Sequence, residues 1–90
     1  MDKKLIIPYS SVIASRTKMG IILVLHDRIL TPSDIAKELD IRINHVSKYL
    51  TELKNKKLIV CLNEYAKKGR LYQLTELGKQ IFIELKKNKL

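Results

Sequence analysis

The segment "IRINHVSKYL", residues 41–50, brings several hydrogen-bonding side chains together within about two turns of a predicted helix. Ile41, Val46 and Leu50 are its apolar residues and indicate one buried side. The side chains on the other side are Arg42, Asn44, His45, Ser47 and Lys48. They carry groups that donate and accept hydrogen bonds. This polar face is therefore either an ordinary solvated helix face or a surface that contacts a partner.

Residues that typically make up a catalytic site or a metal site are scattered in this sequence. No paired carboxylates, no Ser or Cys with a nearby His and no Gly-rich phosphate loop stand out, and the chain has only three glycines. Cys61 is most simply a buried strand residue, with a thiol sensor or a metal ligand as the alternative. His26 and His45 are distant from it in sequence. We therefore predict no enzyme activity, no metal site and no cofactor.

The charge of the chain indicates a polyanionic partner. Against 18 Lys and Arg stand 9 Asp and Glu, which gives a net charge of +9. From residue 42 to residue 70 there are eight basic and two acidic residues, a net +6. An anionic membrane would require these lysines on one amphipathic helix, whereas they divide between a helix end and a predicted loop. Nucleic acid is thus the favoured partner.

Length and hydrophobicity bound the class of protein. Ninety residues, 46% of them apolar, suffice for one small domain, which we place at residues 1–90. A single cysteine permits no intramolecular disulfide, in keeping with a reducing compartment. The longest apolar run, 21–25, falls far short of the ~20 residues of a spanning helix, and the N-terminus lacks the apolar core of a secretory signal. We expect a soluble protein of the cytoplasm.

The first half of the chain contains two predicted helices. One begins at Ser10 or Ser11, either of which is suited to cap it, and runs to about residue 25. The second is short, about 32–39. Its start has Thr31 as the N-cap, a proline in the first helical position and Asp34 in the first turn.

The second half contains a third helix, a hairpin and a terminal helix. The third helix runs from residue 42 or 43 to about residue 56 and buries Val46, Leu50 and Leu53. The runs "LIVCLN" and "RLYQL" are extended and flank a basic turn, which predicts a β-hairpin at about 58–74. A last helix, about 75–88, is capped by Thr75. The fold class is mainly α with a small β-hairpin.

In this order and spacing the sequence resembles the winged helix-turn-helix transcription regulators, of the ArsR and MarR type and like many small archaeal and bacterial examples. The resemblance lies in "SRTKMGIILVL" (15–25), "LTPSDIAKELDIRINHVSKYLTELKNKKLI" (30–59) and "GRLYQLTELGK" (69–79), and it covers most of the chain from about Ser11. It implies a helix-turn-helix at about 32–56, a wing at about 58–74 and sequence-specific binding of double-stranded DNA.

By this resemblance, the helix from Arg42 would enter the major groove with its N-terminal turns. Asn44 is suited to pair with adenine, and Arg42 to contact guanine or a phosphate. The wing would reach phosphates or the minor groove. The residues expected to contact DNA are Thr31, Ser33, Arg42, Asn44, His45, Ser47, Lys48, Tyr49, Lys67, Lys68 and Arg70.

Three positions leave the local geometry open. Asp40 and Lys57 stand where this family commonly has glycine. Aspartate tolerates a left-handed backbone fairly well, and lysine tolerates it less well, at a cost of about 1 kcal/mol. Ile43 either closes the turn against the core or is exposed and meets a thymine methyl group. The lysines at the end of the third helix, Lys54, Lys56 and Lys57, either contact DNA or complement the helix dipole.

A regulator of this size is expected to be a homodimer that binds two half-sites about one helical turn apart. Its expected dimer surfaces are the N-terminal "LIIPY" (5–9) and four residues of the terminal helix, Leu77, Ile81, Phe82 and Leu85. Simple intramolecular packing is the alternative for these residues. The alternative for the whole chain is a winged helix that serves as a protein-interaction module in a larger complex, without a specific DNA target.

Overall fold

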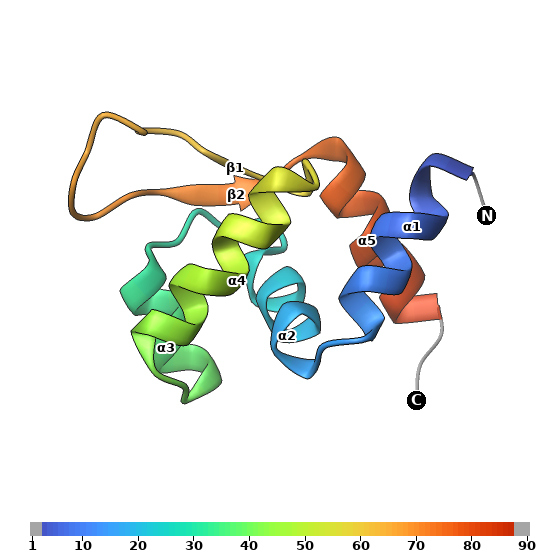
Figure 1. Cartoon of the computed structure of the whole chain (residues 1–90), viewed down its shortest axis with the longest axis horizontal. Helices are drawn as coiled ribbons and strands as arrows, with labels where there is room; N and C mark the ends of the chain where they lie inside the picture. The colour runs from blue at the N-terminus through green and yellow to red at the C-terminus, as the bar shows by residue number, and fades with distance from the viewer. Residues whose placement is uncertain (1–2, 88–90) are drawn as a thin grey trace.

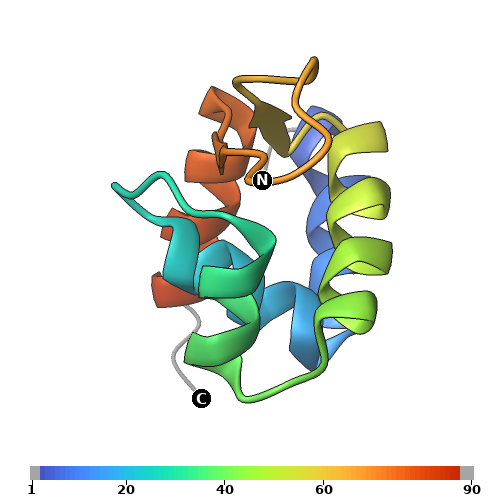
Figure 2. The ribbon, with the colours of Figure 1, turned by 90° about the vertical axis from the view of Figure 1, so that its left-hand side faces the viewer.

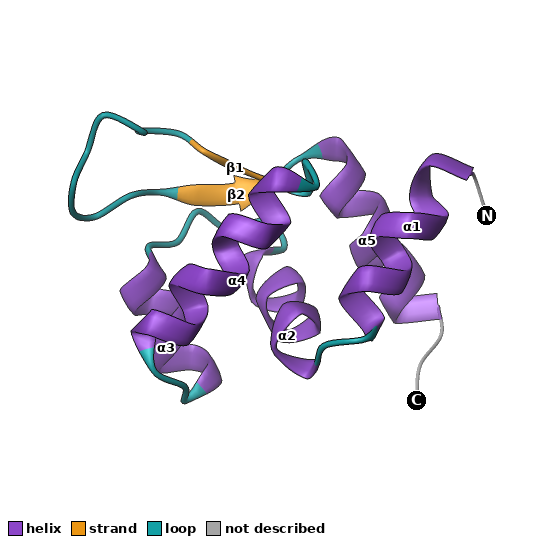
Figure 3. Cartoon of the chain, in the orientation of Figure 1, coloured by secondary structure: helices purple, strands orange, loops and turns teal. Residues whose placement is uncertain are grey.

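The computed structural model describes residues 3–87 and contains five helices and a two-stranded antiparallel sheet in that part of the chain (Figure 1). In chain order the elements are α1 (Lys3–Ile13), α2 (Arg16–Leu25), α3 (Pro32–Leu39), α4 (Ile43–Asn55), β1 (Ile59–Cys61), β2 (Tyr72–Leu74) and α5 (Glu76–Lys87). The predicted fold class, mainly α with a small hairpin, is confirmed (Figure 3). The predicted end of the last helix, residue 88, lies outside the described residues.

The N-terminal region differs from the prediction of a single helix from Ser10 or Ser11 to residue 25. Two helices stand there, because Ser15 adopts an extended backbone (φ −134°, ψ 118°) and caps the start of α2. Its hydroxyl accepts a hydrogen bond from the backbone N–H of Lys18 at 3.2 Å. The first helix begins already at residue 3 and contains the buried Pro8. The predicted single helix is therefore wrong, and the chain turns between α1 and α2.

The core is built around α2. Its residues Ile21, Ile22 and Leu25 are 0–1% exposed, and the helix contacts α1, α3, α4, α5 and β2. In Figure 1 it lies between the α3–α4 pair on one side and the α1–α5 pair on the other. Residues from each neighbour complete the core, among them Val12, Ile35, Leu50, Leu53 and Ile81. One continuous apolar cluster thus holds all the helices.

Lys18 of α2 is 8% exposed, and its ammonium group has polar partners on two neighbouring helices. The Nζ atom lies 2.8 Å from Oε1 of Glu52 in α4 and donates a hydrogen bond to the hydroxyl of Ser11 in α1 at 3.2 Å. It also lies 5.9 Å from the centre of the Tyr49 ring. The hydrogen bond from Lys18 holds the pKa of Glu52 below its usual range. A buried cation therefore joins α1, α2 and α4.

The hairpin is fastened to the body at its base. The strands pair in the register Ile59 with Leu74 and Cys61 with Tyr72. On its other edge, Tyr72 exchanges two backbone hydrogen bonds with Leu30, at 3.1 and 2.9 Å. The loop before α3 is therefore fixed to the same sheet from which the hairpin extends.

Two glycines mark close approaches between elements. A Cβ atom on Gly78 of α5 would lie 2.1 Å from the backbone oxygen of Leu58, so only glycine fits at this position. A Cβ atom on Gly20 of α2 would lie 3.0 Å from Cδ2 of Leu39, which is the flexible end of a side chain. The first contact is with fixed backbone and the second is with atoms that can move.

We expect Gly78→Ala to lower the free energy of unfolding by about 2–4 kcal/mol, because the added methyl group must push α5 away from the start of β1. Gly20→Ala is the matched control and should change it by less than about 1 kcal/mol, since the higher helix propensity of alanine offsets a small shift of Leu39. Urea unfolding followed by circular dichroism measures both. Equal losses in the two variants would contradict this account.

Candidate nucleic-acid interface

The start of α3 is fixed by a reciprocal pair of hydrogen bonds. The Thr31 hydroxyl accepts from the backbone N–H of Asp34, and the Asp34 carboxylate accepts from the backbone N–H of Thr31, both at 3.1 Å. The bond from the Thr31 backbone holds the pKa of Asp34 below its usual value. The reciprocal bonds form a capping box, and with Pro32 in the first turn they confirm Thr31 as the predicted N-cap and the predicted helix bounds.

The loop before α3 is also tied to that helix. The Arg28 guanidinium donates two parallel hydrogen bonds to the carboxylate of Glu38, at 2.8 and 2.7 Å. This pairing lowers the pKa of Glu38. The bridge and the capping box together set where the N-terminus of α3 lies.

The turn between α3 and α4 has a left-handed backbone at Asp40, where the sequence left the geometry open. Asp40 has φ 55° and ψ 48°, and the backbone N–H of Ile41 bonds the carbonyl of Ala36 at 3.1 Å. At the far end of α4, Lys57 also has a positive φ, 64°. Neither residue is glycine, so both positions carry strain that the helix-turn-helix packing must offset.

The exposed side of α4 carries Asn44, Ser47, Lys48 and Thr51, at spacings of three and four residues. Thr51 was not among the predicted site residues, although its position one turn after Ser47 is a signal that sequence reasoning can use. Its hydroxyl donates to the Ser47 carbonyl at 3.1 Å. The half-buried Tyr49 belongs to a different flank, where it lies near Lys18 of α2. The predicted α4 residues thus divide between two faces.

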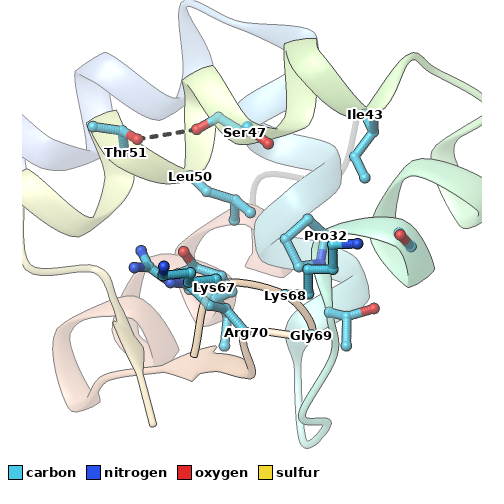
Figure 4. A pocket seen from close by; sticks show the side chains of 12 residues that line it. Pro32, Ile43, Ser47, Leu50, Thr51, Lys67, Lys68, Gly69 and Arg70 are labelled. Carbon is cyan, nitrogen blue, oxygen red and sulfur yellow. Dashed lines mark hydrogen bonds between the residues drawn. The ribbon is translucent and has the colours of Figure 1, made fainter. Parts of the chain in front are cut away.

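A groove of about 500 Å³ runs between the start of α3, α4 and the hairpin (Figure 4). It brings together six predicted residues from three elements: Thr31, Ser33, Ser47, Lys67, Lys68 and Arg70. Its other walls are Pro32, Ile43, Leu50, Thr51, Gly69 and Tyr72. Five predicted residues lie outside this groove: Arg42, Asn44, His45, Lys48 and Tyr49. Figure 2 shows the hairpin loop above the space between α3 and α4.

The hairpin loop is held in shape by its own side chains. The Asn63 amide oxygen accepts from the backbone N–H of Leu71 at 2.7 Å, and its amide nitrogen donates to the Gly69 carbonyl at 3.2 Å. The Arg70 guanidinium donates to the carbonyls of Ala66, at 2.7 Å, and Glu64, at 3.1 Å. Arg70, predicted as a DNA contact, therefore also braces the loop that carries Lys67 and Lys68.

Positive charge on this face is not neutralised within the chain. The two acidic residues of the basic segment are both engaged, Glu52 with Lys18 and Glu64 with Lys54. Across the described residues, five basic side chains at the N-cap of α4, on α4 and on the hairpin have no salt bridge: Arg42, Lys48, Lys67, Lys68 and Arg70. The Lys48 ammonium group lies 5.5 Å from the centre of the Tyr49 ring. An anion on this face would meet unpaired cations.

The structure also settles several open placements. Ile43 is 49% exposed, so it does not close the turn against the core. Cys61 is buried in β1 as expected. Lys54, at the end of α4, forms an ion pair with Glu64 of the hairpin loop.

Among residues 3–87, no group of three His, Cys, Asp or Glu could hold a metal ion, and no helix is long and apolar enough to cross a membrane.

The predicted dimer residues of α5 pack largely within the chain. Ile81 is fully buried, and Leu77, Phe82 and Leu85 are partly buried against the core. The Phe82 ring stacks on His26, with ring centres 3.7 Å apart. The intramolecular alternative is therefore what the structure shows for Ile81, whereas the other three keep some exposed surface.

The chain matches the winged helix-turn-helix family over residues 15–90, and it therefore belongs to that family. Of the described elements, only α1 precedes the matched region. No curated protein matches the chain. The fold and the order of elements agree with the family.

Solved structures of bacterial proteins share this fold. The adhesin competence repressor AdcR of Streptococcus pyogenes is 27% identical, with a TM-score of 0.72 over 81% of this chain and 55% of its own. ZitR of Lactococcus lactis, solved in complex with DNA, is 28% identical, with a TM-score of 0.70 over 79% of this chain and 49% of its own. HlyU of Vibrio cholerae is 18% identical, with a TM-score of 0.76 over 98% of both chains, which shows the fold alone. The chain spans about half the length of AdcR and ZitR.

We expect Lys57→Gly to raise the free energy of unfolding by about 0.5–1 kcal/mol, because glycine adopts a positive φ without strain. Lys56→Gly is the matched control. Lys56 has φ −88°, so the same loss of a lysine should be neutral or destabilising there. Urea unfolding measures both variants, and a shift of the midpoint without a change in the m-value reports the change in stability. If Lys56→Gly stabilises as much as Lys57→Gly, backbone strain at residue 57 is not the cause.

Proposed function

We propose that this protein is a transcriptional regulator that binds double-stranded DNA sequence-specifically, with the exposed side of α4 in the major groove. The observation that carries the proposal is the positive face on which Lys67 and Lys68 of the hairpin line the groove and Lys48 of α4 is exposed outside it. None of these three lysines makes a salt bridge among the described residues. The solved complex of ZitR with DNA, at 28% identity, supports it. Residues 1–90 form one such domain in this proposal, and it acts in the cytoplasm without catalysis.

The side chains have different roles in this proposal. Asn44, Ser47, Lys48 and Thr51 contact base edges or the nearby backbone, because they share the exposed side of α4. Arg42 and His45, at the start of that helix, extend the contact. Thr31 and Ser33 offer hydroxyl groups to a phosphate at the N-terminus of α3, and the flank residue Tyr49 does so beside α4. The lysines of the hairpin, with Arg70 bracing them, follow the phosphate backbone or the minor groove. We also propose that the protein is a regulator of the ArsR and MarR type.

Removing both hairpin lysines, in Lys67→Ala/Lys68→Ala, should weaken binding to every duplex alike and reduce the slope of log K against log salt by about 2. The control Lys3→Ala/Lys86→Ala removes the same charge from exposed positions on α1 and α5 and should leave the slope nearly unchanged. Fluorescence anisotropy at roughly 50 to 300 mM salt measures the binding constant K of both variants for a duplex.

Asn44→Ala should instead relax the preference at one base pair, which a binding array detects.

Two results would count against DNA binding. The first is a wild-type protein with no duplex affinity even at low salt, which would leave the winged helix as a protein-interaction module. The second is an equal loss of salt dependence in the control and in the hairpin variant, which would mean that net charge alone attracts DNA.

We propose further that the protein forms a homodimer through the face where α1 and α5 lie side by side (Figure 1). In these two helices, α1 carries exposed Ile6, Ile7 and Ile13, and α5 carries the partly buried Leu77, Phe82 and Leu85. Buried Ile81 supports α5 from within. Two copies related by a two-fold axis would each present one α4 to successive major grooves.

Ile6→Glu/Ile13→Glu should give a monomer in light scattering after gel filtration, since two charges then face the partner copy. Both residues are exposed, so the fold should be kept. Leu23→Glu/Leu62→Glu, at exposed positions on α2 and next to β1, is the control and should remain dimeric. A wild-type protein that is monomeric at about 10 μM, well above typical dimer constants, would remove the dimer from the proposal.

A further inference from the structure

Ile43 is an apolar side chain at the start of the helix whose exposed side is otherwise polar. It is the first residue of α4 and is 49% exposed, whereas the core side of that helix is formed by Val46, Leu50 and Leu53 at 0–2% exposure. Figure 4 shows it on the wall of the groove, on the same helix as Ser47 and near Pro32 of α3. Part of an isoleucine is thus left uncovered where burial would stabilise the fold.

The turn does not need Ile43. The backbone N–H of Ile41 closes it on the Ala36 carbonyl at 3.1 Å, and Asp40 supplies the left-handed backbone. Arg42, the cap residue of α4, makes no side-chain capping hydrogen bond. The N-cap and the first two residues of α4 are therefore Arg42, Ile43 and Asn44, and all three side chains are exposed.

The major groove of DNA offers one apolar group on its base edges, the 5-methyl group of thymine. The other base-edge groups there are hydrogen-bond donors and acceptors, which an isoleucine would leave unpaired. Among the partners of the proposed interface, thymine is thus the base that Ile43 can recognise favourably.

We infer that Ile43 is a specificity-determining residue that packs against the 5-methyl group of a thymine, in the base pair next to the one that Asn44 contacts. Neighbouring residues in a helix point about 100° apart, so the two side chains meet different base pairs. The inference rests on the proposed function, because it requires α4 in the major groove. It adds a base preference to that function.

The test removes single methyl groups from DNA. A preferred site is first selected from randomised duplexes with the wild-type protein, and each thymine is then replaced in turn by uracil, which keeps the base pairing. Binding is measured by fluorescence anisotropy at fixed salt. One replacement, beside the base pair that responds to Asn44→Ala, should weaken wild-type binding about fourfold, as expected for one buried methyl group.

Protein variants identify the partner of that methyl group. Ile43→Ala should bind the thymine duplex more weakly than wild type and should lose the difference between thymine and uracil at that position. Asn44→Ala is the matched control and should keep the difference, because only its own base pair is affected. Ile43→Thr, which keeps the branched shape, should retain part of the difference and serves as a second variant if the alanine protein is poorly folded.

The outcomes separate this inference from the proposed function. If the wild type binds no duplex, both fail. If the wild type binds a defined site and no uracil replacement weakens it, DNA recognition stands and the role of Ile43 is overturned. The same holds if Ile43→Ala or Ile43→Thr binds more weakly but keeps the full uracil effect, since Ile43 then acts only through the shape of the helix.

Discussion

The burial of one side of α2 among its neighbours is the constraint on which the rest of this structure depends. This ten-residue helix contacts four helices and one strand, and its residues Ile21, Ile22 and Leu25 are buried, whereas Leu23 is exposed. Two of its neighbours meet it through particular residues: Gly20 allows Leu39 of α3 to approach closely, and Lys18 forms an ion pair with Glu52 of α4. Because close-packed cores transmit displacement, a shift of α2 would move α3 and α4 together. The exposed side of α4 is thus positioned from inside the molecule.

Much of the helix-turn-helix could be predicted because its signals are local. The pair Thr31 and Asp34 marks the start of α3 within four residues, and Val46, Leu50 and Leu53 define the buried side of α4 by spacing alone. The separation of α1 from α2 could not be predicted in the same way. The apolar pattern continues across Ser15, whose role as a cap depends on backbone angles. Proline is unfavourable inside a helix, yet Pro8 is buried within α1.

For the candidate interface, sequence spacing identified which side chains share a helix but not which neighbours they meet. Asn44, Ser47 and Lys48 lie together because they are three and four residues apart. The hydrogen bonds of Arg70 to the hairpin carbonyls and the burial of Ile81 both depend on segments distant in sequence or on tertiary packing. Lys18 is the clearest case, since no pattern in the sequence marks a lysine that will be buried and paired.

The bracing of the hairpin loop by Asn63 and Arg70 has a consequence for how fast and how tightly a ligand can be held. A loop that must become ordered on contact loses conformational entropy at that moment, which weakens association and slows productive docking. Here four side-chain hydrogen bonds to the loop backbone fix its course beforehand, so it is the exposed side chains, among them Lys67 and Lys68, that remain to be ordered. In the proposed complex the hairpin therefore acts as a preformed arm, and its fixed backbone limits which duplex shapes it can follow.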